Sequence, residues 1–174
     1  MESTMGMTLT EKILARKTGQ AKVSPGDMVT VGVDTVVLVD TMFAPGRWRK
    51  IRRLDHPERV IVVLDHRAPT PDKAGAASHQ TARQFVEQFG IKRFHDIGYD
   101  QGISHQLVAD FAYALPGSLL VCSDSHTGSA GVFNCLARGV GVPDVVYAAT
   151  LGETWFIVGE TIRYELTGKL ANGV

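Results

Sequence analysis

Cysteine is scarce in this chain. Its 174 residues include two cysteines, Cys122 and Cys135, which can form at most one disulfide bond. A small secreted fold held together by disulfides is therefore excluded, and free thiols are the default in a cytosolic enzyme. A Cys-x-x-Cys motif is also missing, so no compact cysteine site for a metal is indicated. Cys122 ends an apolar run and is interpreted as a buried small residue, not as a reactive thiol.

The chain also lacks net charge and long apolar runs. Its 18 basic and 18 acidic residues give a formal net charge of zero, which indicates no nucleic-acid partner. Apolar stretches such as residues 36–39 and 111–122 are too short to cross a bilayer, so no membrane partner is expected. Residues 1–7 lack the basic start and apolar core of a signal peptide. We interpret them as a flexible leader to one domain, residues 8–174, and expect a cytoplasmic protein.

Strands and helices are predicted to alternate along the chain. Residues 60–64, Val-Ile-Val-Val-Leu, are typical of a strand buried on both faces of a parallel sheet. The alternation predicts the α/β class, with three layers (α/β/α) around a largely parallel sheet. The predicted helices are 8–17, 45–54, 74–89, 106–112, 131–139 and 143–150, and the predicted strands are 28–33, 36–39, 60–64, 91–97, 119–121, 154–158 and 161–167.

Acidic, hydroxyl and imidazole side chains gather where predicted strands end. They are Asp65 and His66 after one strand, Asp124, Ser125 and His126 after another, and His105 in a loop that enters a helix. Because loops at the carboxyl ends of parallel strands converge, we expect these side chains to meet at one rim. Three imidazoles and two carboxylates placed there can transfer protons near neutral pH.

Small residues and a predicted helix follow Asp124. The N-terminus of that helix, residues 131–139, would offer unpaired N–H groups and partial positive charge to an anion. The sequence therefore predicts half of an active site for a small carboxylated substrate in this loop. The remaining histidines, His56, His79 and His95, have no comparable setting and are interpreted as ordinary residues.

Other interpretations of the same side chains stay open. Each one, taken alone, is more often a hydrogen-bonded loop residue than a catalyst. Ser125 with His126 as base would make a nucleophile, but sequence neighbours seldom align that way, and the Gly-x-Ser-x-Gly elbow is absent. A zinc hydrolase using His66, His105 and His126 is a more distant alternative.

Residues 121–127, Val-Cys-Ser-Asp-Ser-His-Thr, together with Gly-Val-Gly at 139–141, resemble the N-terminal domain of the aconitase superfamily. Within it, the resemblance is to large subunits of the 3-isopropylmalate dehydratase kind, with homoaconitase and 2,3-dimethylmalate dehydratase nearby. It implies an incomplete aconitase-type domain. The other segments that resemble the family are 7–15, 64–66, 101–106 and 153–169.

The resemblance implies catalytic roles for these side chains. Asp65 and His66 would form the pair that protonates the departing hydroxyl of the substrate. Asp124 and His105 would form a second pair near that hydroxyl and the bound water. His126 would contact the leaving oxygen or water.

The resemblance further implies the reaction and its partners. The enzyme would be a hydro-lyase of leucine biosynthesis that dehydrates and rehydrates a hydroxylated di- or tricarboxylate such as isopropylmalate. Ser125 and Thr127 would bind the substrate. The complete enzyme would carry a [4Fe–4S] cluster whose ligating cysteines are absent from this chain.

The chain alone is therefore predicted to be an inactive fragment. Its expected partners are the remainder of a large subunit and a small subunit, or a second copy of itself. The alternative is a non-catalytic module on the same fold, which would bind a carboxylate or serve in assembly.

Overall fold

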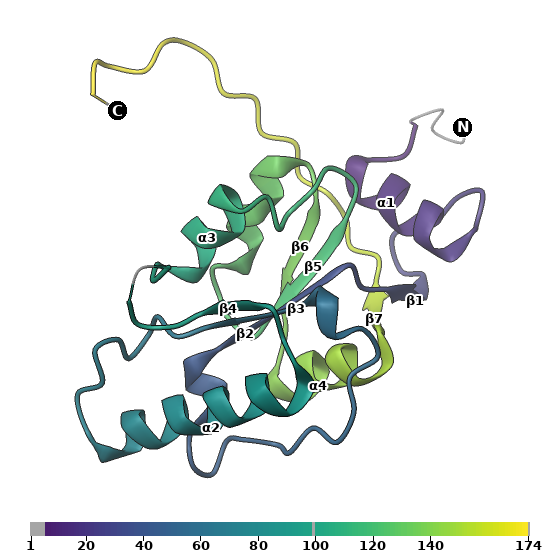
Figure 1. Ribbon diagram of the computed structural model, residues 1–174. Helices are drawn as coiled ribbons and strands as arrows, with labels where there is room; N and C mark the ends of the chain where they lie inside the picture. Colours follow the sequence, from purple (N-terminus) through teal and green to yellow (C-terminus); the bar gives the residue numbers. More distant parts are fainter. Residues whose placement is uncertain (1–5, 99, 174) are drawn as a thin grey trace.

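A five-stranded sheet with the strand order β4-β3-β2-β5-β6 lies at the centre of the molecule (Figure 1). The computed structural model describes residues 6–98 and 100–173, and residues 1–5 of the predicted leader lie outside this part. Every neighbouring pair of strands in the sheet is parallel. The strands are β2 (Thr35–Val39), β3 (Val60–Val63), β4 (Arg93–His95), β5 (Leu119–Cys122) and β6 (Leu136–Gly139).

The three middle strands of the sheet, β2, β3 and β5, are buried along their whole length. Their residues are mostly Val, Leu and Ile, whose side chains pack well on both faces of a pleated surface. Burial of both faces requires a layer of helices on each side of the sheet. The sequence prediction for residues 60–64 is confirmed.

Helices form those two outer layers. Leu38 of the sheet packs in one core with Phe85 and Val145, which belong to helices on one face. Val37, on the opposite face, packs in a second core with Leu107. This confirms the predicted three-layer α/β/α class. In the described part of the chain, no helix is both long and apolar enough to cross a membrane. The α-helices are α1 (Leu9–Thr18), α2 (Lys73–Phe89), α3 (Ser104–Asp110) and α4 (Val142–Leu151), and the 3₁₀ helices are η1 (Asp40–Phe43), η2 (Pro57–Arg59) and η3 (Thr127–Phe133).

A separate antiparallel pair joins an early and a late segment of the chain. Strand β1 (Met28–Gly32) pairs with β7 (Glu153–Ile157), so that Met28 lies opposite Ile157. Phe156 points into the core, whereas the side chain of Trp155 on the other side of the strand is half exposed. The main sheet is therefore purely parallel, and the antiparallel ladder lies beside it.

The first helix begins and ends as the sequence predicts. The hydroxyl of Thr8 accepts the backbone N–H of Glu11, and the carboxylate of Glu11 accepts the backbone N–H of Thr8. This reciprocal capping box satisfies two N–H groups that have no partner inside the helix. Gly19 then ends the helix in the left-handed conformation, at φ 71°.

The basic helix predicted for residues 45–54 is wrong. Gly46 adopts φ 80°, a left-handed conformation that interrupts a helix, and the following residues are irregular. Two apolar side chains fix this segment instead. Trp48 packs edge-on against Phe85 at 5.4 Å between ring centroids, and Ile51 is buried. These contacts outweigh a helical tendency that rested mainly on charged residues.

The helix predicted for residues 131–139 is also wrong. Asn134 adopts a left-handed conformation at φ 59° and ends the 3₁₀ helix η3. The next residues form strand β6, in which Leu136 lies opposite Leu119 of β5. Pairing with an existing strand satisfies the backbone groups of residues 136–139 that a helix would otherwise pair internally. The expected anion site at a helix N-terminus is therefore not present here.

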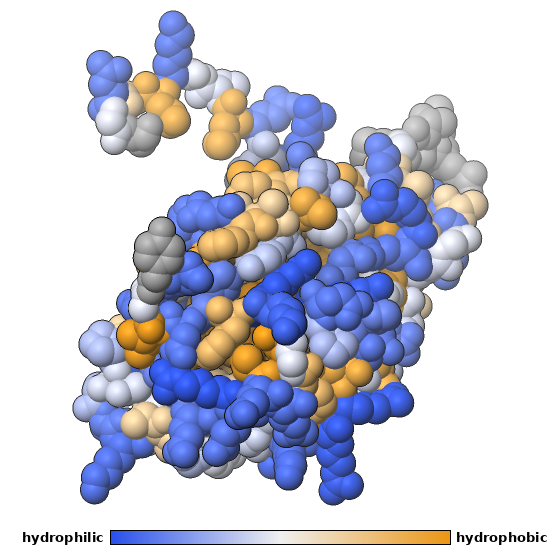
Figure 2. All heavy atoms as spheres, in the orientation of Figure 1, coloured by the Kyte–Doolittle hydropathy of each residue, from blue (hydrophilic) through white to orange (hydrophobic). Residues whose placement is uncertain are grey.

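The strand predicted for residues 161–167 is not formed. Residues 158–167 have no regular secondary structure, and the chain after the buried Val158 runs away from the body of the molecule (Figure 1). A strand needs a hydrogen-bonding neighbour, and no neighbour for it lies in the described residues. Hydrophobic and hydrophilic side chains are mixed along the segment (Figure 2). The largely exposed apolar residues from here to the end of the described chain are Ile162, Tyr164, Leu166 and Leu170.

Candidate active site

The carboxyl edge of the sheet brings carboxylates from three neighbouring strands together. Asp40 follows β2 directly, Asp65 follows shortly after β3, and Asp124 follows shortly after β5. Because β3, β2 and β5 are adjacent and parallel, their carboxyl ends lie at the same edge. Each carboxylate contacts at least one imidazole there.

Alternating carboxylates and imidazoles form a continuous chain of hydrogen bonds. His66 Nδ1 lies 2.6 Å from Asp65 Oδ1, and its Nε2 lies 3.0 Å from Asp124 Oδ2. The other oxygen of Asp124 lies 2.8 Å from Nε2 of His105. His66 thus bridges the two Asp-His pairs that the sequence analysis kept separate. We call this group the Asp-His chain (Asp65, His66, Asp124 and His105).

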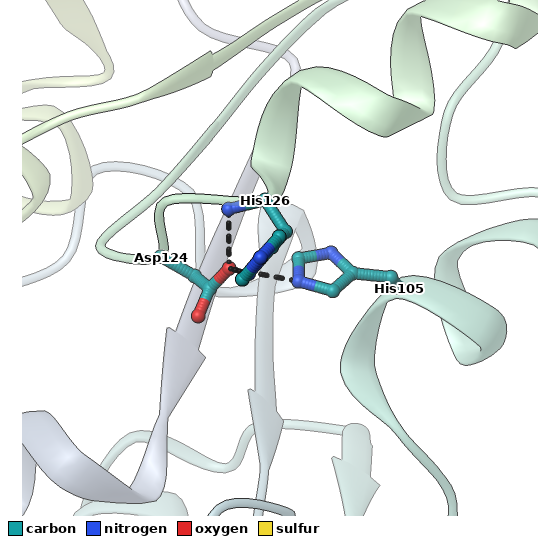
Figure 3. A group of neighbouring side chains, drawn as sticks. All are labelled: His105, Asp124 and His126. Atoms are coloured by element: carbon teal, nitrogen blue, oxygen red, sulfur yellow. Dashed lines mark hydrogen bonds and ion pairs between the residues drawn. The ribbon is translucent and has the colours of Figure 1, made fainter.

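His126 stands at the open side of this chain. Its backbone N–H donates to Asp124 Oδ1 at 2.7 Å, as the dashed line in Figure 3 shows. Its ring nitrogen Nδ1 lies 3.5 Å from the same oxygen, and the side chain is 80% exposed. The main chain of His126 therefore fixes Asp124, while its imidazole is free to meet a ligand.

Burial separates the carboxylates from the imidazoles. The side chains of Asp65 and Asp124 are 6% and 10% exposed, whereas His66 and His105 are 35% and 27% exposed. The buried oxygens are satisfied, because Asp65 Oδ2 also accepts the backbone N–H of Ser104 at 2.8 Å. Solvent and small molecules reach the imidazoles first, and the carboxylates hold them from below.

The loop after β5 is braced by a hydroxyl and by a close backbone contact. Thr127 is buried and donates its hydroxyl to the backbone oxygen of Asp124 at 2.6 Å. Ser125 Oγ lies 3.4 Å from His126 Nδ1 and stays on the accessible side. Both were expected to bind substrate, and the structure places Ser125 alone at the surface of the site. A Cβ atom at Gly139 would stand 2.5 Å from the backbone oxygen of Asp124, so β6 supports the loop closely.

A hollow of about 540 Å³ adjoins the Asp-His chain, between this loop and strand β6. Arg138 is one of the residues that line it, and the guanidinium of an arginine stays charged at any ordinary pH. Arg138 was not predicted to lie at this edge, because the predicted helix over 131–139 gave it no place there. We call this space the Arg138 hollow, and its lining residues are Ser123, Asp124, Ser125, Gly128, Ala137, Arg138, Gly139, Val140 and Gly141.

The hydrogen bonds shift the pKa values of Asp124 and His66 in opposite directions. Burial raises the pKa of Asp124, but the N–H of His126 and the bonds from His66 and His105 outweigh it and place the pKa below its ordinary value. Burial likewise lowers the pKa of His66, but Asp65 and Asp124 outweigh it and place the pKa above its ordinary value. The structure therefore favours an anionic Asp124 beside a protonated His66, which is a proton donor held between two carboxylates.

These two shifts predict how folding stability depends on pH. Because the pKa of Asp124 is lowered, its contribution is complete above its ordinary pKa of 3.8 and is lost as the pH falls through the lower folded value. The pKa of His66 is raised, so its contribution is complete below 6.5 and is lost as the pH rises through the higher folded value. The free energy of unfolding is expected to be greatest between about pH 4 and pH 6.5.

Urea unfolding at a series of pH values measures this profile. The His66→Gln variant should flatten the decline above pH 6.5, because it removes the group that loses its proton there. The acid side of the profile should keep its direction in this variant, since Asp124 remains. An unchanged decline above pH 6.5 in His66→Gln would contradict the assignment.

Two side chains behind the edge escaped the sequence analysis. Asp40 and His79 are completely buried, at 0% and 1% exposure, with His79 Nε2 3.2 Å from Asp40 Oδ2. Asp40 follows strand residues 36–39 just as Asp65 and Asp124 follow theirs, so the same rule would have found it. His79 lies inside helix α2, where no local pattern marks it.

Some of these side chains have the spacing of metal ligands. The ligand atoms of His105, Asp124 and His126 all lie within 4.8 Å of one another. Those of Asp40, Asp65 and His66 form a second such group. In this structure the oxygens of Asp124 accept N–H donors from all three histidines. The zinc alternative, which used the three imidazoles, stays a prediction that metal analysis of the purified chain would test.

The fold and the edge together define an α/β protein equipped for acid–base chemistry. Residues 33–174 match the aconitase family (aconitate hydratase), so the chain belongs to the aconitase family. The resemblance expected from the sequence is confirmed.

Curated relatives carry a more particular name. The chain is 46% identical over 170 residues to a 3-isopropylmalate dehydratase large subunit of Mycolicibacterium smegmatis, covering 98% of this chain and 40% of that protein. It is 39% identical over 169 residues to such a large subunit of Pyrococcus furiosus, covering 95% and 40%. A probable large subunit of Methanothermobacter thermautotrophicus is 34% identical over 175 residues, covering 98% and 41%. The chain spans about two fifths of the length of these relatives.

The cysteines of this chain do not fit the iron–sulfur cluster that the resemblance implies. Cluster ligands are cysteine thiolates. Burial raises the pKa of Cys122 to about 12 and also raises the pKa of Cys135, so both thiols keep their protons. Cys135 donates its S–H to the backbone oxygen of Ala130 at 3.1 Å. Both side chains are packed in the core between sheet and helices, which agrees with their interpretation as small apolar residues.

Proposed function

We propose that this chain supplies the acid–base half of a hydro-lyase active site. The reaction would remove water from a hydroxylated di- or tricarboxylate such as isopropylmalate and add it back at the neighbouring carbon. The Asp-His chain is the observation that supports this proposal. It places an imidazole at an accessible edge, with a buried carboxylate within hydrogen-bond distance of each ring nitrogen.

Loss of a hydroxyl group as water requires a proton at the moment the C–O bond breaks. His66 donates that proton. Burial lowers its pKa, but the hydrogen bonds to Asp65 and Asp124 raise it above its ordinary value and so favour the protonated ring. The two carboxylates keep the ring oriented as it loses and regains the proton. The exposed imidazole of His126 contacts the departing water. We assign these residues to proton delivery and not to abstraction of the C–H proton.

A carboxylated substrate also needs a fixed cation, because this edge carries buried carboxylates of its own. Arg138 lines the hollow together with Asp124 and Ser125, and we assign its guanidinium to this role. Guanidinium groups bind carboxylates through two parallel hydrogen bonds, and the Ser125 hydroxyl adds a further donor. We propose that one substrate carboxylate lies in the Arg138 hollow while the hydroxyl faces His66 and His126.

A chimera tests this function directly. The aligned region of the M. smegmatis large subunit, which is 46% identical, is replaced by this chain and co-expressed with the small subunit of that enzyme. We expect the chimera to dehydrate isopropylmalate, measured by ultraviolet absorbance of the unsaturated product, and the isolated chain to show no turnover. A chimera that assembles and folds but is inactive would overturn the proposal.

An assembly module is the second candidate, and the exposed apolar side chains of the C-terminal segment favour it. Leu166 is 97% exposed and Tyr164 is 83% exposed, which is costly for side chains of this size in water. A large-subunit remainder, a small subunit or a second copy would cover them. A stable heteromer by mass measurement, with no binding of malate-type dicarboxylates by calorimetry, would favour this candidate over the hydro-lyase.

A further inference from the structure

A carboxylate with no exposure to solvent lies directly behind the Asp-His chain. Asp40 is the first residue of η1, at the end of the central strand β2, and its side chain is 0% exposed. Burying a carboxylate is unfavourable unless hydrogen-bond donors replace the lost water. The hydrogen-bond donors around Asp40 therefore indicate the role of this buried carboxylate.

Those donors tie Asp40 to the main chain of the bridging histidine. Asp40 Oδ1 accepts the backbone N–H of His66 at 3.2 Å, and Oδ2 accepts the backbone N–H of Arg67 at 2.8 Å. The remaining donor is Nε2 of His79, 3.2 Å from Oδ2, in helix α2. This geometry fixes the tautomer of His79, since Nε2 must carry the hydrogen that the carboxylate accepts.

The side chain of His66 also lies near the Asp40 carboxylate. Its Nδ1 lies 3.6 Å from Asp40 Oδ1 and 2.6 Å from Asp65 Oδ1, so the N–H bond is directed to Asp65. Nε2 must at the same time reach Asp124 at 3.0 Å. A ring held at both nitrogens tolerates little displacement of its own backbone, and that backbone is what Asp40 holds.

We propose that Asp40 and His79 are a positioning pair for His66. They hold the main chain of His66 so that its imidazole spans Asp65 and Asp124, and they touch no substrate because both are completely buried. The inference rests on the proposed function in one respect, which is that the positioned ring is the proton donor. Its structural content concerns His66 alone and can be measured without turnover.

Nitrogen-15 NMR of the histidine rings in the purified chain provides the first readout. In Asp40→Asn, which keeps the shape but lacks the second acceptor oxygen, we expect the ring signals of His66 to shift and its slowly exchanging Nδ1–H signal to be lost. Asp96→Asn is the matched control. Asp96 follows strand β4, pairs with Arg83 at 2.7 Å and makes no contact with His66, so the His66 signals should stay in place.

His79 supplies a second comparison if Asp40→Asn does not fold. His79→Gln keeps an N–H donor for Asp40, whereas His79→Phe fills similar space without one. We expect the His66 signals of His79→Gln to resemble those of the parent and those of His79→Phe to shift. A simple packing role for His79 would give the opposite order, because Phe replaces the ring more closely than Gln does.

Kinetics in the chimera provide the second readout. Asp40→Asn should lower kcat by about 10²-fold and leave KM within about twofold, because a misplaced donor affects the chemical step and not substrate binding. Unchanged His66 signals and unchanged kcat in a folded Asp40→Asn chimera would overturn the inference. If the parent chimera is inactive while Asp40→Asn still shifts the His66 signals, the proposed reaction fails and the positioning of His66 stands.

Discussion

Replacing Asp124 by asparagine is expected to lower the turnover of the chimera by about 10³- to 10⁴-fold, the scale seen when a histidine-orienting carboxylate is lost. Asp124 Oδ2 accepts from His66, and Oδ1 accepts from both His105 and the N–H of His126. Asparagine has a single acceptor oxygen, and its NH₂ group would face a ring N–H. One imidazole must then turn away or change its tautomer.

Asparagine has nearly the same shape as aspartate, so Asp124→Asn changes hydrogen bonding and charge but not packing. A control variant carries the same change elsewhere. Asp96→Asn makes the same chemical change at the end of β4, the edge strand that β3 and β2 separate from β5, where the lost partner is Arg83. That carboxylate is partly exposed and remote from the substrate, so turnover should stay within about twofold, as for surface substitutions in general. Retention of more than a tenth of the parent kcat in a folded Asp124→Asn chimera would contradict the role given to the Asp-His chain.

The meeting of the named side chains at one edge could be predicted from the sequence because it depends on topology. Residues 60–63 and 119–122 are apolar runs with few alternatives to a buried parallel strand. Once both strands run parallel in one sheet, whatever follows them lies at the same edge, so Asp65 and Asp124 were expected to lie near each other. The convergence of the named side chains required no knowledge of distances.

The link between the two Asp-His pairs could not be predicted in that way. Sequence neighbours suggested His66 for Asp65 and resemblance suggested His105 for Asp124, but the 3.0 Å bond from His66 to Asp124 depends on ring orientation. That orientation depends on Asp40, whose partners lie 26 to 39 positions away in the chain. His79 looked ordinary for the same reason, since its only marker is a contact distant in sequence.

The helix predicted for residues 131–139 is wrong for a local reason that can be found in the sequence, which is Asn134. Asn134 tolerates the left-handed conformation better than most residues, and it ends η3 before a full helical turn can follow. The residues after it were then available to pair with β5, and they form β6 at the edge of the five-stranded sheet. With this helix assignment, Arg138 and Gly139 were given no place beside Asp124.

Gly139→Ala is expected to disrupt the site because its added methyl group would clash with the backbone of the loop that carries Asp124, and not with a side chain. The added Cβ would stand 2.5 Å from the backbone oxygen of Asp124, and Gly139 is held in place by pairing with Cys122 of β5. Neither partner can swing aside as a side chain does. We expect a loss of about 1–3 kcal/mol in the free energy of unfolding, typical of overpacking, and about 10²-fold lower kcat in the chimera.

Gly131→Ala is the matched control for this substitution. Gly131 lies in η3, a few residues along the same loop, and a Cβ built there meets no atom within 4 Å. In Gly131→Ala the free energy of unfolding should change by less than about 0.5 kcal/mol, as for most substitutions that remove no contact. Urea unfolding and the ring signals of His105 and His126 measure both variants. If Gly139→Ala matches Gly131→Ala in stability and in these signals, the loop carrying Asp124 does not depend on its close contact with β6, and the support assigned to that strand is wrong.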